Sequence, residues 1–166
     1  MIVLADSSPL ITLARARHFE LLREFYGKLI VSREVYDEVA GGADLPGAKE
    51  VRTASWIRVD SVSTEPVPEI KLACAGLGAG ERTIVYLACG LKADLVLIDE
   101  VKARRAAKTA RLNVAGSIAV LERGARLGLV GNLRSVYQSL LEQGIRYDER
   151  LLNRSLERLR TAGRIP

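Results

Sequence analysis

Short apolar runs that end at an acidic residue stand out along the chain. Residues 2–5 are apolar and Asp6 follows them, while residues 95–98 are apolar and Asp99 follows them. Runs of this length, followed by helical spacing, are typical of buried strands that lead into helices. The carboxyl ends of parallel strands meet at one edge of a sheet, where open α/β sheets bind ligands. We therefore expect Asp6 and Asp99 at the same edge.

The rest of the chain continues this alternation of strands and helices. Further strands are expected over residues 28–31, 57–62 and 112–115. The spacing of apolar residues predicts helices over residues 10–26 (broken near 17–18), 33–40, 81–90, 101–111, 117–126, 133–142 and 148–162, with Ser32 and Ser117 as N-caps. Residues 43–56 are expected to form a loop with one short helix, and residues 64–68 an irregular connection. The pattern predicts an α/β protein with a parallel sheet.

The composition is that of an ordinary globular protein. The chain has 166 residues, of which 48% are hydrophobic, so it can bury a sizeable core without disulfides. We expect a single domain, with a core of about residues 1–130 and a C-terminal helical part of about residues 131–166. The leucines of the last helix either close this core or pack against a second subunit.

The sequence gives no indication of a membrane span. No apolar run approaches the roughly 20 residues that a spanning helix needs, and no basic segment precedes the short apolar stretch at the start. Cys74 and Cys89 are too few and too far apart for a zinc framework, so we expect two reduced thiols. These features predict a soluble, cytoplasmic protein.

The charge of the chain favours a polyanionic partner. The formal net charge is +5, which would attract nucleic acid or an acidic protein. Five basic residues crowd the helix predicted after Asp99, namely Lys102, Arg104, Arg105, Lys108 and Arg111. This segment is either a solvated helix face or the lining of a phosphate track.

Four acidic residues are placed where they can converge on one pocket. Asp6 and Asp99 end strands, and Glu81 opens a helix. Glu38 lies on the helix after the second strand. Carboxylates this close repel one another and need a compensating cation, and oxygen ligands select hard ions such as Mg²⁺ or Mn²⁺. Such an ion activates a water and neutralises charge on a phosphoryl oxygen, so the expected chemistry is hydrolysis of a phosphodiester.

Each acid also has a structural alternative that the sequence leaves open. Asp6 could cap the helix that follows it, and Glu81 could complement the dipole of its own helix. Glu38 could be a solvated surface acid. Asp99 is harder to explain in this way, because it directly follows four strand-forming residues. The combination of the four acids, and no single one of them, favours a metal site.

Other catalytic arrangements lack the residues they need. His18 is the only histidine, and it lies in an early helical stretch far from the strand ends, which argues against Ser-His-Asp or Cys-His catalysis. The glycines of residues 76–80 are not followed by the Lys-Ser/Thr pair of a P-loop, so we interpret them as the start of a helix.

Several short motifs occur in a fixed order along the chain. They are Asp-Ser-Ser-Pro-Leu-Ile at 6–11, Val35 with Glu38, Gly80 with Glu81, Leu-Ile-Asp-Glu at 97–100 followed by Ala103 and Arg104, and Val-Ala-Gly-Ser at 114–117. This ordered set resembles PIN-domain proteins over roughly residues 2–130, and most of all the small prokaryotic branch related to VapC-type toxins.

The resemblance implies a three-layer α/β/α sandwich with a central, mostly parallel sheet. It also implies a Mg²⁺- or Mn²⁺-dependent endoribonuclease, often a homodimer that a cognate antitoxin protein inhibits. Carried over by position, the catalytic and metal-binding acids would be Asp6, Glu38, Glu81 and Asp99. RNA would bind across the strand-end pocket, with phosphate contacts or support for the acids from Ser7, Ser8, Arg104 and Ser117.

Two positions depart from the pattern of the family. Many relatives have proline at the position of Ser32, and many active toxins have a further aspartate where this chain has Val101, a role that Glu100 would take over. These departures leave open a second function, in which the fold is a binding or regulatory module with a vestigial acidic pocket. A receiver-like domain is disfavoured, because it needs paired acids after the first strand and a lysine after the last.

Overall fold

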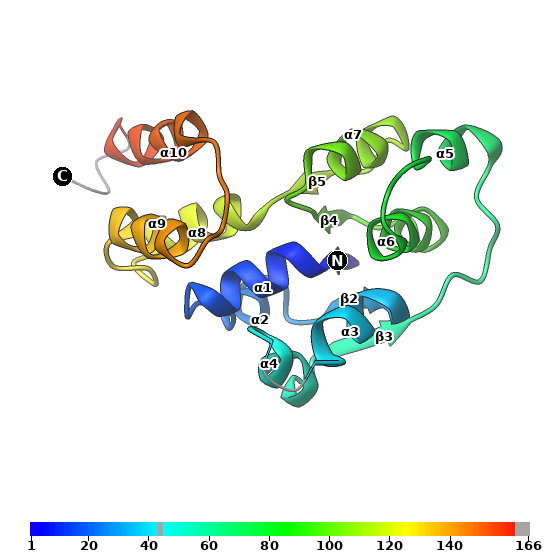
Figure 1. Cartoon of the computed structure of the whole chain (residues 1–166), viewed down its shortest axis with the longest axis horizontal. Helices are drawn as coiled ribbons and strands as arrows, with labels where there is room; N and C mark the ends of the chain where they lie inside the picture. Colours follow the sequence, from blue (N-terminus) through cyan, green and yellow to red (C-terminus); the bar gives the residue numbers. More distant parts are fainter. Residues whose placement is uncertain (43–44, 162–166) are drawn as a thin grey trace.

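The computed structural model describes residues 1–42 and 45–161, and this part of the chain contains a five-stranded sheet in which all neighbouring strands are parallel. The strands follow the order β3-β2-β1-β4-β5 (Figure 1). Their bounds are β1 Val3–Ala5, β2 Leu29–Ser32, β3 Ile57–Asp60, β4 Leu95–Leu97 and β5 Val114–Ala115. The first strand of the sequence is therefore the central strand of the sheet.

Helices cover the sheet in two layers. Their bounds are α1 Ser7–Arg15, α2 Leu21–Tyr26, α3 Arg33–Ala40, α4 Ala48–Thr53, α5 Pro68–Ala73, α6 Ala79–Gly90, α7 Val101–Thr109, α8 Ser117–Arg126, α9 Leu133–Glu142 and α10 Glu149–Thr161. Helices α3 and α6 pack against β2 and against each other, whereas α2 contacts β2 and packs against α8. The fold is a three-layer α/β/α sandwich with a parallel sheet, which confirms the predicted fold class.

The central strand positions the acids at one edge of the sheet. All three residues of β1 are buried, as expected for a parallel strand covered on both faces. The amide of Asp6 donates to the carbonyl of Leu97 at 2.9 Å, so pairing with β4 continues one residue beyond β1. Asp99 follows two residues after Leu97, and the prediction that Asp6 and Asp99 share one edge is confirmed.

Helices α1 and α2 confirm a prediction from the sequence, whereas helix α5 adds an element that was not predicted. The stretch 10–26 forms two helices as predicted, α1 and α2, although α1 already begins at Ser7. Helix α5 was not predicted, because none of its residues is buried and its sequence carries no apolar period. Pro68 at its first position fixes a backbone angle that suits a helix start.

The two serines predicted as N-caps behave differently. The Ser32 hydroxyl accepts a hydrogen bond from the amide of Val35 at 3.2 Å, which confirms it as the cap of α3. The prediction for Ser117 was wrong: Gly116 is the N-cap of α8, and Ser117 is the first residue within the helix. Its hydroxyl donates to the Asp99 carboxylate and does not cap the helix.

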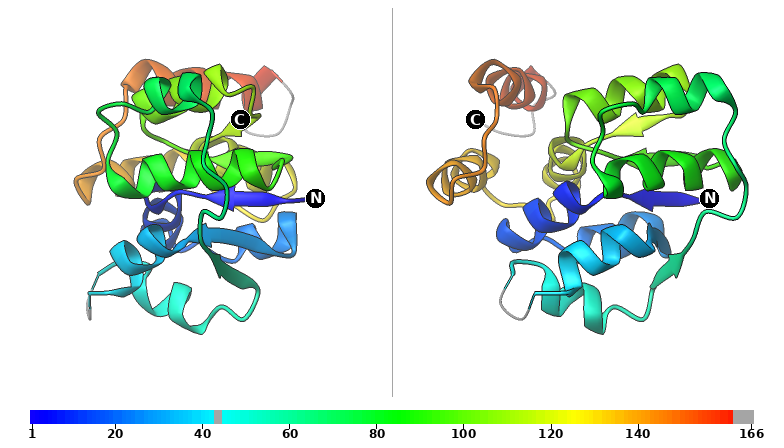
Figure 2. Two further views of the ribbon diagram at one scale, coloured as in Figure 1. Left: turned by 90° about the vertical axis from the view of Figure 1, so that its right-hand side faces the viewer. Right: turned by 45° about the vertical axis from the view of Figure 1, so that its right-hand side comes forward.

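The C-terminal helices α9 and α10 lie together at one end of the molecule (Figure 2). Helix α10 packs against α8 and α9 and buries Leu152, Leu156 and Leu159. The leucine face therefore packs within the chain. Of the helix predicted over residues 148–162, Ala162 lies outside the described residues.

Polar contacts fix α10 in place. The Tyr137 and Ser155 hydroxyls lie 2.6 Å apart in a buried hydrogen bond between α9 and α10. Arg158 of α10 donates to the carboxylate of Glu122, a nearly buried residue of α8. Both cysteines are free thiols, as expected. Within residues 1–42 and 45–161, no helix is long and apolar enough to cross a membrane.

We expect the substitution Leu159→Ala to lower the free energy of unfolding by about 2–5 kcal/mol, because it leaves a cavity at a fully buried site. The matched change Leu151→Ala, at a side chain of the same helix that is 36% exposed, should cost less than about 1 kcal/mol. Denaturant unfolding measures both. Equal, small losses would show that α10 is not part of the cooperative core and would contradict the prediction of a single domain.

Candidate functional site

An acidic cleft opens at the carboxyl edge of the sheet. It has a volume of about 500 Å³, and its walls come from the start of α1, from α3 and from the N-terminal end of α6. Its lining residues are Asp6, Ser7, Ser8, Glu34, Glu38, Gly78, Ala79, Gly80 and Glu81. Three of the four predicted acids therefore share one cleft. Glu34, which lies one helical turn before Glu38, joins them although the sequence analysis did not select it.

Asp6 is the most unusual residue of the acidic cleft. Asp6 is only 1% exposed, and neither of its carboxylate oxygens makes a hydrogen bond of ordinary geometry. It is the N-cap residue of α1 but makes no side-chain cap bond, so capping does not explain it. The pKa of Asp6 is raised from 3.8 to about 7, first by burial and then by the charges of Glu81, Glu38 and Asp99, although the Ser7 amide lowers it in part.

Gly80 lets two carboxylates approach the start of α6. A Cβ atom at this position would lie 3.0 Å from Oε2 of Glu38 and 3.9 Å from Oδ1 of Asp6, so these two oxygens are at most about 7 Å apart. Because the Asp6 oxygens are buried beside it, a side chain at residue 80 would fill the space that separates the two acids. The missing side chain keeps that space open.

Glu81 has a structural role as well as a place in the cleft. Its Oε2 accepts a hydrogen bond from the amide of Gly78 at 2.9 Å, across the first turn of α6. This contact satisfies one of the amides that a helix start leaves without a partner. The helix-start role that the sequence left open for Glu81 is therefore real, and it also fixes the carboxylate at the rim of the cleft.

The donors of the cleft are suited to a hard divalent ion. They are carboxylate and hydroxyl oxygens, and the buried Asp6 carboxylate has no other partner. In the described part of the chain, however, no three acidic, histidine or cysteine side chains are grouped closely enough to hold one ion together. The arrangement fits an ion such as Mg²⁺, which takes one or two carboxylates and keeps several waters.

Asp99 lies at the same edge but is turned towards α8. Its Oδ1 accepts from the Ser117 amide at 2.7 Å and its Oδ2 from the Ser117 hydroxyl at 2.8 Å. Burial raises the pKa of Asp99, whereas these hydrogen bonds and the charge of Arg104 lower it. Asp99 does not line the acidic cleft, so the structure brings together three of the four predicted acids and holds the fourth beside them.

Tyr147 completes the hydrogen-bond network of Asp99. Its hydroxyl lies 2.5 Å from the Ser117 Oγ, and because that Oγ donates to Asp99, the tyrosine must be the donor of this contact. The pKa of Tyr147 is raised to about 12, mainly by burial and also by the charge of Asp99, although hydrogen bonds with Ser117 and Thr12 lower it in part. The sequence analysis missed Tyr147, which lies between α9 and α10.

Of the residues after β4, some contact the backbone at the sheet edge and others are exposed to solvent. The Glu100 carboxylate accepts from the Ala103 amide at 2.7 Å and so caps α7. Arg104 donates to the carbonyl of Ile98 at 2.6 Å and faces inward. The neighbouring Lys102, Arg105 and Lys108 are exposed. The basic segment is thus mostly a solvated helix face, and Arg104 is its member at the sheet edge.

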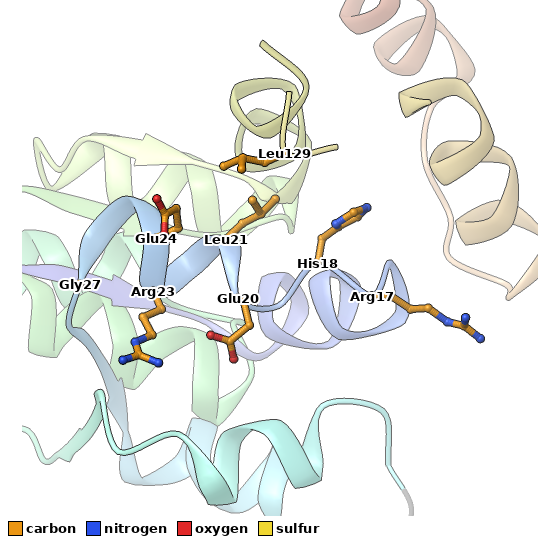
Figure 3. Close-up of a pocket in the computed structure, with 8 residues that line it drawn as sticks. All are labelled: Arg17, His18, Glu20, Leu21, Arg23, Glu24, Gly27 and Leu129. Carbon is orange, nitrogen blue, oxygen red and sulfur yellow. The ribbon is translucent and has the colours of Figure 1, made fainter. Parts of the chain in front are cut away.

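His18 lies in a separate cavity at the end of α1, beside Arg17 (Figure 3). Burial lowers the pKa of this partly buried imidazole. The cavity has a volume of about 580 Å³ and is lined by Arg17, His18, Glu20, Leu21, Arg23, Glu24, Gly27 and Leu129. It shares no lining residue with the acidic cleft, so His18 is not positioned to act with Asp6.

Comparison with known families identifies the fold. A family model described as a PIN domain matches residues 2–161. The chain belongs to the PIN-domain family. Neither the comparison with curated proteins nor the one with solved structures gives a match. PIN domains are generally nucleases, so the family supports a hydrolase in general terms, and the acidic cleft lies at the carboxyl edge of the sheet with Asp6 in its lining.

We expect the stability of the metal-free protein to fall as the pH rises from about 4 to about 7. Because the pKa of Asp6 is raised by folding, the folded state keeps a proton in this window that the unfolded state has released. A shift from 3.8 to about 7 corresponds to roughly 4 kcal/mol. Asp6→Asn should remove most of this loss and be more stable than the wild type at pH 8.

Denaturant unfolding in EDTA at several pH values measures this difference. Asp37→Asn, on α3 but outside the cleft, is the matched control and should follow the wild type. If Asp6→Asn is the less stable protein at pH 8, the Asp6 carboxylate is not buried without a partner.

Proposed function

We propose that this PIN domain is a divalent-metal-dependent endoribonuclease whose active site is the acidic cleft. The observation that carries the proposal is the buried Asp6 carboxylate, which makes no hydrogen bond of ordinary geometry and faces the charges of Glu38, Glu81 and Asp99. A carboxylate in such surroundings needs either a proton or a cation near neutral pH. A site that binds a cation in place of this proton is suited to a substrate that brings negative charge.

Asp6 and Glu38 are the residues proposed to bind Mg²⁺ or Mn²⁺ directly, and Glu81, at the rim of the cleft, is proposed to bind it through water. When bound there, the ion would supply positive charge at the scissile phosphate and lower the pKa of an attacking water. Ser7 and Ser8 line the same cleft and offer hydroxyls to phosphate oxygens. Asp99, held by Ser117, adds negative charge beside Asp6 and so favours the ion without lining the cleft.

RNA as substrate is supported by the net charge of +5 and by the inward-facing Arg104 at the sheet edge. Within this proposal the chain would act in the cytoplasm as a VapC-like toxin, form a homodimer, and be inhibited by an antitoxin protein. These finer assignments come from the family resemblance of the motifs around Asp6 and Asp99.

A second candidate is a PIN-fold binding or regulatory module with a weak acidic pocket. It is favoured by the spacing of the acids, since no three of those in the described residues are grouped closely enough to hold one ion. Val101, at a position where active toxins often have an aspartate, favours it too. Calorimetric titration with Mn²⁺ separates the two candidates, because a vestigial pocket would bind the ion weakly or not at all.

We expect purified protein to cleave a mixed pool of structured RNA in Mn²⁺ and to be inactive in EDTA. Asp6→Asn should lower kcat/KM by at least about 100-fold, because it removes the carboxylate proposed to bind the ion most directly. Asp99→Asn should also lower it, and Asp37→Asn should not. Cleavage that persists in Asp6→Asn at the wild-type rate would rule out the acidic cleft as the active site.

Tyr147 is expected to support cleavage through Ser117 and Asp99. Tyr147→Phe removes the hydroxyl that donates to Ser117 and should lower kcat about 3- to 10-fold with little change in KM. The chain offers a matched control, because Tyr137 makes the same kind of contact to Ser155 away from the site. Tyr137→Phe should cost a similar stability, about 1 kcal/mol, without loss of kcat. Equal activities of the two variants would contradict a role for Tyr147.

A further inference from the structure

A second cavity adjoins the acidic cleft, and we call it the side cavity. It has a volume of about 680 Å³ and lies between the sheet edge and the connection from α9 to α10, which passes over α8 in Figure 1. Ser8 lines both cavities, and Asp99 lines the side cavity. A chain with a phosphate at the acidic cleft would therefore have a neighbouring group within reach of the side cavity.

The walls of the side cavity are largely apolar and partly open. Val101 is 58% exposed there, and the other apolar side chains of the lining are Ile11, Ile118, Ala119, Ile145 and Leu151, with Tyr147 beside them. When a ligand covers an aliphatic side chain at the mouth of a cavity, apolar surface is removed from water, which favours binding. The lining thus favours a ligand with an apolar face, of a size typical for small-molecule sites.

The charges of the side cavity disfavour a free phosphate. Four carboxylates line it, Asp99, Glu100, Glu122 and Asp148, against three guanidinium groups, Arg104, Arg146 and Arg158. Asp99 is bound by Ser117, Glu122 by Arg158, and Asp148 by the amide of Arg150. A site without excess positive charge is suited to a neutral ligand whose edge both donates and accepts hydrogen bonds.

We propose that the side cavity binds the nucleobase of the nucleotide next to the scissile phosphate, which makes it the subsite for base preference. A nucleobase is flat and apolar on its faces, and its edge carries donors and acceptors for arginine and carboxylate side chains. This inference rests on the proposed nuclease function for its substrate. The base binding itself requires neither a metal nor turnover.

The first experiment titrates the protein in EDTA with the uncharged ribonucleosides adenosine, guanosine, cytidine and uridine, and with ribose as the control that lacks a base. Binding is followed by NMR. At least one nucleoside should bind about 10-fold more tightly than ribose. Ala119→Phe, which fills the cavity from an exposed position on α8, should weaken that binding about 10-fold or more.

Two further variants keep this experiment decisive. Ala75→Phe makes the same change at an exposed alanine outside the three cavities and should bind like the wild type. Val101→Ser removes an exposed apolar wall without adding bulk, so it tests the cavity if Ala119→Phe fails to fold. Nucleosides that bind no better than ribose, or binding that survives both Ala119→Phe and Val101→Ser, would overturn the proposal.

Mapping of cleavage sites in the RNA pool separates this proposal from the proposed function. If the wild type prefers one base at the cleavage site and Ala119→Phe loses that preference, both are supported. Cleavage with the same preference in both proteins would overturn the side cavity as a subsite and leave the nuclease in place. Nucleoside binding that Ala119→Phe abolishes, in a protein that cleaves no RNA, would support the base site and overturn the nuclease.

Discussion

The charge of Asp6 at the end of the central strand is the constraint on which the rest of the site depends. Because β1 has a paired strand on each side and is fully buried, the residue that follows it cannot turn towards water as a residue of an edge strand would. A carboxylate fixed there is protonated or faces a cation near neutral pH. The surroundings suit this demand: Gly80 leaves space beside the oxygens, and further acids raise the local negative charge.

The two strand-end acids have the same sequence pattern but different surroundings. Asp6 makes no hydrogen bond of ordinary geometry, whereas Asp99 is bound twice by Ser117 and lies near Arg104. The difference comes from Gly116, which lies between the neighbouring strand β5 and the start of α8. A Cβ at that residue would lie 2.6 Å from the Asp99 carboxylate, so only glycine lets α8 start close enough to bind it. Asp6 is thereby left available to a ligand, whereas Asp99 is bound to the first residue of α8.

Much of the fold and part of the site follow from local patterns in the sequence. The apolar runs before Asp6 and Asp99 are predictable because a buried parallel strand needs side chains that are apolar on both faces. Glu38 was selected because its helix follows the second strand, and Glu81 because it opens a helix after a run of glycines. The family resemblance suggested Ser117 as support for the acids, but which acid it binds depends on where α8 starts. The contact from Tyr147 was not predictable, since it joins residues 30 positions apart. Helix α5 buries nothing and left no apolar period.

The contact between Tyr147 and Ser117 has a consequence for how the protein is made. During synthesis the sheet has all its strands once residue 115 has been added, and α8 can then start. The tyrosine that completes the Asp99 network is translated 30 residues after its partner, and α10 follows it. The five strands and the four acids therefore lie before residue 116, whereas the last polar contact of their edge needs residue 147. A chain that stops before residue 147 would contain all five strands but would lack the hydrogen bond from Tyr147 to Ser117.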